Sequence, residues 1–238
     1  MSAKNVVESR AHRAVDEAAE VRPAKHAFAI LLLAAATGFA SATPAQLYSR
    51  AGGTMVYDSD LDITWLADAN YAATQYEQSC GEIGAPDGKM TWPEATRWAA
   101  GLVYAGYDDW RLPTTPTADA SCDEQDLIGT YGFHCTGGEM GHLFYGDIGH
   151  GLGGVAGESI IRVHNDNFHL FRNFSSFGAY WLGTEFAPLA QIALNFHTRN
   201  GFANANSKSV FLLAWAVRDG DVVDVSPDPG SKNPAKCK

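Results

Sequence analysis

Phe211-Leu212-Leu213-Ala214-Trp215-Ala216-Val217 is an uninterrupted apolar run near the end of this 238-residue chain. A short apolar run of this kind predicts a strand in the middle of a sheet, and we place that strand within residues 210–218. Two further strands are expected before it, at residues 180–184 and 191–196, and Asn200-Gly201 predicts a tight turn. The second half of the chain is therefore predicted to form an antiparallel sheet.

The first half of the chain predicts two helices and several short strands. Thr91-Trp92-Pro93-Glu94 is a capping box with proline in the first turn, and apolar residues follow it at helical spacing. Another helix is expected between Asp68, a possible N-cap, and Glu77. Three short strands are expected before it, at residues 47–50, 55–58 and 63–66.

A long glycine-rich region separates the two halves, from Thr115 to Phe177. Apart from a short helical possibility around Glu139 to Tyr145 it lacks strong periodicity, which predicts an irregular loop. The expected fold class is α+β: a compact domain with two helices, a small antiparallel sheet and this long loop region. Because loops commonly carry function, we expect the region to face the ligand, and deletion of residues 146–157 to leave thermal stability nearly unchanged.

Five motifs follow one another between residues 47 and 221. They are Thr64-Trp65-Leu66-x-Asp68-Ala69-Asn70-Tyr71, Met90-Thr91-Trp92-x-Glu94-Ala95, Asp109-Trp110-Arg111-Leu112-Pro113-Thr114, Tyr180-Trp181-x-x-Thr184-Glu185 and Trp215-Ala216-Val217-Arg218-Asp219-Gly220-Asp221. In this order they resemble the Lcl C-terminal domain family, long known as domain of unknown function 1566. The resemblance implies a C-type lectin-like fold, related in architecture to the formylglycine-generating enzymes. The family is named for the C-terminal domain of a collagen-like bacterial adhesin, which implies a role in adhesion.

The N-terminus predicts export. An apolar run from Ala27 to Ala36 precedes a small-residue site at Ala40-x-Ala42, and together they predict a signal peptide cut after Ala42; a buried N-terminal helix is the alternative. The chain is then divided into a signal peptide (1–42), an Lcl C-terminal-like domain (43–221) and a polar tail (222–238). We expect a secreted or periplasmic protein with no membrane span after cleavage. The tail lacks the apolar anchor that many similar exported family members carry.

The predicted mature chain is strongly acidic. Residues 1–42 hold five of the 17 Lys and Arg and four of the 27 Asp and Glu, so 12 basic and 23 acidic side chains remain, a net charge of −11. Nucleic acid is not an expected partner, because phosphate recognition needs a basic surface. The expected partner is an extracellular glycan or a surface protein.

All four cysteines lie after the predicted cleavage site, where disulfides can form. Cys122 and Cys135 bracket one loop and are predicted to bond, which would stabilise the fold by about 3 kcal/mol on the chain-entropy model. Cys80 and Cys237 remain as a second pair, although Cys237 could stay free or bond another molecule. Zinc is the alternative, but the sequence has no Cys-x-x-Cys.

Signals for catalysis or a metal centre are weak. Nucleophile-elbow, phosphate-loop and His-Glu-x-x-His motifs are missing, and no Gly-x-Gly-x-x-Gly follows an expected strand, so no catalytic residue is assigned. Glu139 and His142 have a spacing that puts two ligands on one helix face, but one such pair is half a site, and Glu139 also fits a structural role. Six histidines cluster in or just after the glycine-rich region, and solvated loop positions are the favoured interpretation. They are His134, His142, His150, His164, His169 and His197.

Calcium-dependent sugar binding, which a lectin-like fold invites, would need an unusual site here. The usual Glu-Pro-Asn, Gln-Pro-Asp and Trp-Asn-Asp signatures are missing. Calcium prefers oxygen ligands, and no other cofactor is expected. The candidate ligand-binding residues in the long loop are Asp147, Glu158, Asn165, Asp166, Asn167, Phe168 and Phe171. The two phenylalanines could instead pack on the core with Phe174, which is the favoured interpretation.

Eight further residues are expected to be structural. An arginine beside a tryptophan can stack on its ring and bind a carboxylate through two N–H groups, so buried ion pairs are expected for the charged members. The residues are Trp92, Trp98, Trp110, Trp181, Trp215, Arg111, Glu185 and Arg218. The whole sequence then predicts an exported non-catalytic binding module for adhesion or glycan and surface recognition. A divergent enzyme on a formylglycine-generating-enzyme-like fold is the alternative.

Overall fold

The computed structural model of the chain describes residues 46–126, 129–186 and 189–222. The predicted signal peptide, Cys237 and residues 223–238 of the predicted tail lie outside the described residues. Within the described part, the helices all lack the length and apolar character that crossing a membrane requires.

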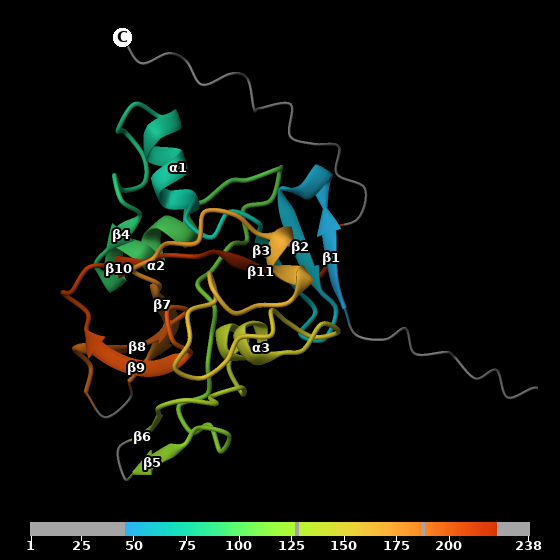
Figure 1. Ribbon diagram of the computed structural model, residues 1–238. Coiled ribbons are helices and arrows are strands. Elements are labelled where there is room, and N and C mark those ends of the chain that lie inside the picture. The colour runs from blue at the N-terminus through green and yellow to red at the C-terminus, as the bar shows by residue number, and fades with distance from the viewer. Residues whose placement is uncertain (1–45, 127–128, 187–188, 223–238) are drawn as a thin grey trace, which may run out of the picture. The chain divides into compact units, whose positions relative to one another are not determined.

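One sheet joins the first described strands to the last (Figure 1). Its four strands lie in the order β1-β2-β3-β11, and every neighbouring pair is antiparallel. The strands are β1 (Leu47–Arg50), β2 (Met55–Asp58), β3 (Ile63–Leu66) and β11 (Val217–Asp219). The three strands expected at the start of the chain are therefore present, and the sheet is completed from the other end of the domain.

A second sheet has five strands in the order β4-β10-β7-β8-β9. They are β4 (Lys89–Met90), β10 (Leu212–Leu213), β7 (Ala179–Glu185), β8 (Ile192–His197) and β9 (Phe202–Ser207). Strands β10 and β7 pair in parallel, which corrects the expectation of a purely antiparallel second half. The remaining pairs are antiparallel.

The apolar run at residues 211–217 does not form one central strand, which is a second correction. Its Leu212 and Leu213 make β10 in the five-stranded sheet, whereas Val217 begins β11 in the four-stranded sheet. Trp215 lies in the connection between them, is 1% exposed, and donates its indole N–H to the Leu66 carbonyl at 2.8 Å. Residues 212–217 are buried because they pass from one sheet to the other through the core, whereas Phe211 is 60% exposed.

Three α-helices are present among the described residues rather than two. They are α1 (Tyr71–Gln78), α2 (Trp92–Ala100) and α3 (Glu139–Tyr145). The capping box of α2 is present, with the Glu94 carboxylate accepting from the backbone N–H and the hydroxyl of Thr91. Asn70, not Asp68, is the N-cap of α1. Two 3₁₀ helices, η1 (Ala51–Gly53) and η2 (Asp166–Leu170), complete the helical elements of this part of the chain. The mixture of helices and sheets is the predicted α+β class.

The core is rich in aromatic rings around Trp215. The rings of Trp65, Phe171, Phe174 and Tyr180 all lie with centroids 5.0–5.6 Å from its ring. Trp110 and Trp181 are also buried. Trp92 and Trp98 are only half-buried: they pack against the core while their indole N–H groups donate to Leu182 and Gln75.

The three charged residues expected in buried ion pairs differ from one another. Arg111 makes a bidentate pair with Glu139, at 2.8 and 2.9 Å, and the carboxylate side chain is 14% exposed. Arg218 pairs with Asp109, whose side chain is 52% exposed. Glu185 lies on the surface and pairs with Lys208 at 3.0 Å, so the expectation of a buried pair is wrong for this residue.

Candidate functional site

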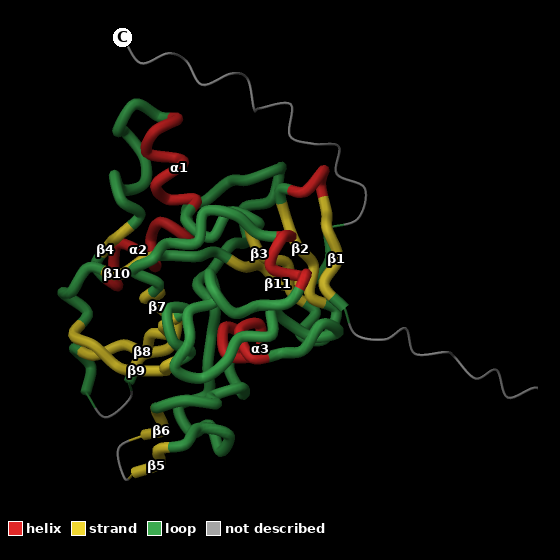
Figure 2. Tube along the Cα trace, in the orientation of Figure 1, coloured by secondary structure: helices red, strands yellow, loops and turns green. Residues whose placement is uncertain are grey.

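Most of the glycine-rich region from residue 115 to 177 is loop in the structure (Figure 2). Within it lie α3, η2 and a small hairpin of β5 (Glu124–Asp126) and β6 (Gly129–Tyr131). The predicted Cys122–Cys135 disulfide is confirmed and encloses this hairpin. Cys80 is also disulfide-bonded. Its predicted partner lies outside the described residues.

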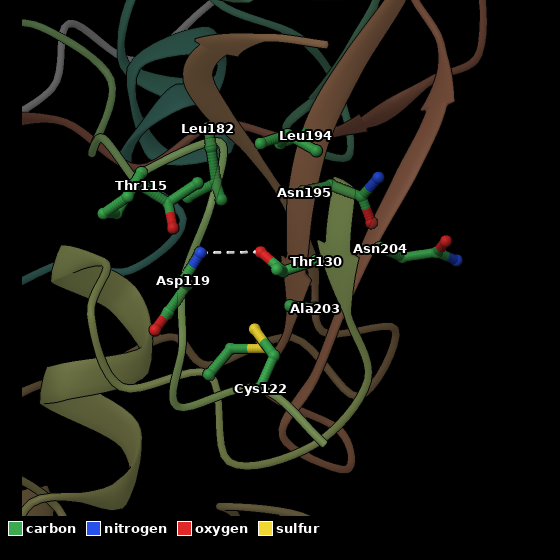
Figure 3. A pocket seen from close by; sticks show the side chains of 11 residues that line it. Thr115, Asp119, Cys122, Thr130, Leu182, Leu194, Asn195, Ala203 and Asn204 are labelled. Carbon is green, nitrogen blue, oxygen red and sulfur yellow. Dashed lines mark hydrogen bonds between the residues drawn. A yellow bond between two sulfur atoms is a disulfide. The ribbon is translucent and has the colours of Figure 1, made fainter. Parts of the chain in front are cut away.

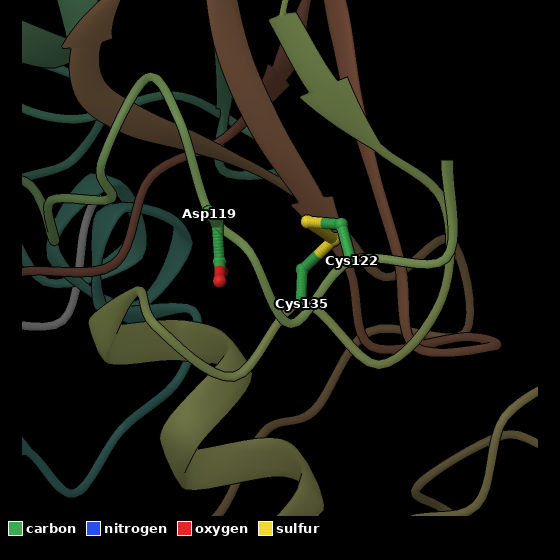
Figure 4. Close-up of side chains that lie close together, drawn as sticks. All are labelled: Asp119, Cys122 and Cys135. Atoms are coloured by element: carbon green, nitrogen blue, oxygen red, sulfur yellow. A yellow bond between two sulfur atoms is a disulfide. The ribbon is translucent and has the colours of Figure 1, made fainter. Parts of the chain in front are cut away.

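Asp119 lies beside the Cys122–Cys135 disulfide (Figure 4), and its hydrogen bonds join the two sides of the disulfide loop. Its carboxylate accepts from the Ser121 N–H and hydroxyl and, at 2.8 Å, from the Gly137 N–H. Asp119 and the two sulfurs lie close enough to share a metal ion. However, each sulfur is bonded to the other, so neither is the thiolate that a metal requires. This cluster is structural.

A small pocket lies beside the same disulfide (Figure 3). Thr115, Thr130, Leu182 and Asn195 are among its lining residues, and the Thr130 hydroxyl accepts from the Asp119 N–H at 2.8 Å. The pocket has the size that holds about one water molecule. It is too small for a sugar ring or a substrate.

The segment after α3 folds back over the helix through close backbone contacts. The N–H groups of Leu152 and Gly154 donate to the carbonyls of Leu143 and Phe144, which belong to the last turn of α3. A Cβ added at Gly151 would lie 2.5 Å from the Leu143 oxygen, and one at Gly154 would lie 2.6 Å from the Phe144 ring. Glycine is therefore required here by close approach, and Leu152 is 1% exposed. Part of residues 146–157 is core, so their deletion should destabilise the domain, contrary to the sequence-based expectation.

The three acidic residues among the predicted calcium ligands do not come together as one group. Among the described residues, neither group of acidic, histidine and cysteine side chains that is close enough to hold a metal includes Asp147, Glu158 or Asp166. The amides serve the loop instead: Asn165 accepts from the Asn167 N–H, and Asn167 donates to the carbonyls of Ile148 and Gly151.

The phenylalanines of the candidate set pack inward. Phe171 is 6% exposed against Trp215. Phe168 is half-buried, with its ring stacked between those of Phe174 and His164 at centroid distances of 4.8 and 3.9 Å. The favoured interpretation of core packing therefore holds for this group.

Another cluster of ionisable side chains forms between the β2–β3 turn and α3. Asp58 ends β2, Asp60 follows in the turn, and His142 projects from α3. The His142 Nε2 atom lies 3.4 Å from Asp60 Oδ2 and 3.9 Å from Asp58 Oδ2. His150, from the segment folded over α3, hydrogen-bonds through Nδ1 to Asp60 Oδ2. Four side chains from three parts of the chain thus converge.

Burial differs sharply within this cluster. The Asp58 side chain is 1% exposed, those of Asp60 and His142 are 21% and 23% exposed, and that of His150 is 49% exposed. Burial raises the pKa of Asp58, an effect that the nearby His142 opposes. The hydrogen bond to Asp60 raises the pKa of His150. Asp147, of the predicted ligand set, lies at the edge, 3.8 Å from His150 Nε2.

Glu139 and His142 do not act as a pair, although they share a helix. Glu139 is fully engaged by Arg111 and by the Thr114 N–H, which donates at 2.6 Å. This agrees with the structural role weighed for Glu139 from the sequence. His142 instead meets Asp58 and Asp60, which the sequence did not single out. The available signals were the Asp58-Ser59-Asp60 turn and the clustering of histidines, but nothing in the sequence linked them.

Comparison of the chain with protein-family models, with curated proteins and with solved structures finds no match.

Proposed function

We propose that this chain is an exported, non-catalytic binding module that recognises a surface partner through its glycine-rich region. One observation carries the proposal: residues 148–161 have an irregular backbone that hydrogen bonds hold in place, and they expose large aliphatic side chains. Ile148, Val155 and Ile161 are 61%, 49% and 40% exposed, while hydrogen bonds to α3 and to Thr198 and Asn200 hold the intervening backbone. Ordered loops that present apolar side chains are typical of recognition surfaces.

Disulfide bonding at Cys122, Cys135 and Cys80 supports export, because disulfides persist in oxidising compartments. The motifs that resemble the Lcl C-terminal domain family support an adhesive role, and a C-type lectin-like fold is part of the proposal. The large apolar side chains that residues 148–161 expose are aliphatic, and Phe168 and Phe171 pack inward, whereas Tyr131 and Phe177 elsewhere in the glycine-rich region are 38% and 40% exposed. For the aliphatic segment we therefore propose a protein surface rather than a glycan as the partner.

The test is binding of the purified protein to immobilised extracellular-matrix proteins and to a glycan and glycosaminoglycan array. We expect binding to a protein of the panel. The triple variant Ile148→Asp, Val155→Asp, Ile161→Asp should weaken it by at least about tenfold, since each change puts a charge into the buried centre of an interface. The melting temperature should stay near that of wild type because all three side chains are exposed.

Val103→Asp is the matched control, because Val103 is 69% exposed and lies outside the region. It should leave binding unchanged. Full binding by a folded triple variant, or equal loss in the control, would contradict the proposal. If the chain bound glycans but no protein of the panel, the partner would be a glycan rather than a protein surface.

A further inference from the structure

The cluster between the β2–β3 turn and α3 has contact distances that hydrogen bonding does not explain. His142 Nε2 lies 3.4 Å from Asp60 Oδ2 and 3.9 Å from Asp58 Oδ2. Hydrogen bonds between nitrogen and oxygen are about 2.7–3.2 Å long. In a tetrahedral site with ligand distances of about 2.0–2.1 Å, neighbouring ligand atoms are about 3.3 Å apart. The His142–Asp60 distance fits two ligand atoms of one ion better than it fits a hydrogen bond, and the His142–Asp58 distance is about half an ångström longer than this spacing.

We propose that Asp58, Asp60 and His142 bind a divalent first-row transition-metal ion, with Zn²⁺ as the reference case, and that His150 orients Asp60. This site is separate from the exposed segment of the proposed function and does not depend on its partner.

An independent observation points to a cation at this place. Asp58 Oδ1 accepts from the N–H groups of Asp60 and Leu61, which fixes the carboxylate in the turn. Its other oxygen, Oδ2, is buried and has no hydrogen-bond partner, and the same is true of His142 Nε2. A buried polar atom that is left unsatisfied destabilises the fold, and the effect is larger for a charged group. One ion between these two atoms would satisfy both.

The ligand types select the class of metal. Calcium and magnesium take oxygen ligands, whereas imidazole suits zinc, copper, iron and nickel. One imidazole with two carboxylates leaves a fourth position, as in zinc sites that keep a place for water or a ligand. Asp62, the next acid of the turn, lies outside the set because its Oδ1 accepts from the Tyr57 hydroxyl at 2.8 Å.

His150 fits the role of a residue that hydrogen-bonds to a metal ligand without contacting the ion, as metal sites commonly include. Its Nδ1 hydrogen-bonds to Asp60 Oδ2, and partners of this kind orient the carboxylates that ligate the ion. The glycine-rich turn places it there: Gly146 and Gly151 approach so closely that a Cβ on Gly146 would lie 2.7 Å from the Gly151 nitrogen. The metal would thus connect the β2–β3 hairpin to α3 and, through His150, to the segment folded over that helix.

The test is metal titration of the chelator-treated full chain by calorimetry, together with the visible absorption of the Co²⁺ form. We expect one metal ion to bind per chain at this cluster. The Co²⁺ form should show the absorption typical of a four- or five-coordinate ion. Asp58→Asn keeps the acceptor Oδ1 of the turn but removes the charge, and it should weaken Zn²⁺ binding by more than about 100-fold, as should His142→Ala. His150→Ala should weaken binding by about 10–100-fold.

His169→Ala is the matched control, since His169 lies in the same region, is exposed and is outside the cluster. It should leave the affinity unchanged. Zn²⁺ affinity equal to wild type in Asp58→Asn and His142→Ala would overturn the site, as would failure of the wild type to bind Zn²⁺ or Co²⁺. Binding of Ca²⁺ in preference to Zn²⁺ and Co²⁺ would contradict the proposal that the site takes a transition metal. If metal-free Asp58→Asn is unfolded, Asp60→Asn provides the same test at a partly exposed residue.

Discussion

Bidentate arginine–carboxylate pairs fasten together segments that are far apart in the sequence. Arg50 binds Asp221, 171 residues away, at 2.7 and 2.8 Å. Arg218 binds Asp109 at the same two distances, and its guanidinium lies 4.2 Å from the centre of the Tyr107 ring. The planar guanidinium makes two parallel hydrogen bonds and stacks on a ring, so lysine could not replace arginine in either pair without loss.

The Arg50–Asp221 pair should make stability depend on pH. Hydrogen bonding to Arg50 lowers the pKa of Asp221, so its contribution is present above the unfolded pKa of about 3.9 and is lost as the pH falls through the folded value. Asp221→Asn should lower the free energy of unfolding at pH 7 by up to about 1 kcal/mol. The gap to wild type should narrow in urea titrations at about pH 3 and below. Asp108 is exposed and has no ion pair in the described structure, so Asp108→Asn should have the same free energy of unfolding as wild type. If Asp221→Asn differed from wild type by the same amount at every pH, the Arg50–Asp221 pair would not be the cause.

Whether a contact between two residues can be predicted depends on how far apart the residues lie in the sequence. Cys122 and Cys135 border one loop, and their bond could be predicted from that loop alone. Asp58 and His142 lie in opposite halves of the sequence. Their proximity depends on how α3 packs against the first sheet, and no pattern within either segment encodes that packing. The candidate metal site was therefore missed although both of its halves were visible.

Elements with strong local signals were predicted, and those that depend on distant partners were not. Helix α2 follows from its capping box and apolar spacing, both of which are properties of the segment itself. Strand β9 was missed because Phe202–Ser207 alternates small and amide residues and gains its structure from pairing with β8. The run at residues 211–217 was predicted to be one central strand, but its division between two sheets depends on which neighbours it meets.

The glycines after α3 should differ in their tolerance of alanine according to the space around them. A Cβ at Gly151 would meet backbone at 2.5 Å, whereas one at Gly157 would have nothing within 4 Å and only a positive φ of 83° to accommodate. We expect Gly151→Ala to lower the free energy of unfolding by about 3 kcal/mol or more through overpacking. Gly157→Ala should cost about 1–2 kcal/mol from its left-handed backbone alone. Chemical denaturation measures both, and the reverse order would show that the segment is not packed tightly on α3.

At the scale of the whole molecule, the glycine-rich region is tied to the sheets at several places. Gly132 and Ala203 exchange backbone hydrogen bonds between the disulfide loop and β9, and the Ile160 N–H donates to the Thr198 carbonyl. Arg111 and Val217 exchange hydrogen bonds just before the region begins. We therefore expect the glycine-rich region to unfold together with the sheets, although some of its side chains are exposed.

Removal of the Cys122–Cys135 disulfide should therefore weaken the whole domain. The double variant Cys122→Ser, Cys135→Ser should lower the free energy of unfolding by about 3 kcal/mol, since the unfolded chain is no longer constrained by the closed loop. Denaturation under oxidising conditions keeps the bond at Cys80 intact and isolates the effect. If only the β5–β6 hairpin gained rapid hydrogen exchange while global stability stayed unchanged, the hairpin would be an independent unit.

The pairing of β11 with β3 also sets the order in which this protein can fold. β3 gains its outer neighbour only after residues 217–219 have been synthesised, and Trp65 gains the contact with Trp215 at the same late stage. Contacts between such distant segments slow folding, because a long loop must close before they form. A growing chain therefore cannot complete this aromatic core until β11 has been synthesised. For a polypeptide exported as we propose, this late closure would keep the domain unfolded during passage and let it complete only on the far side of the membrane.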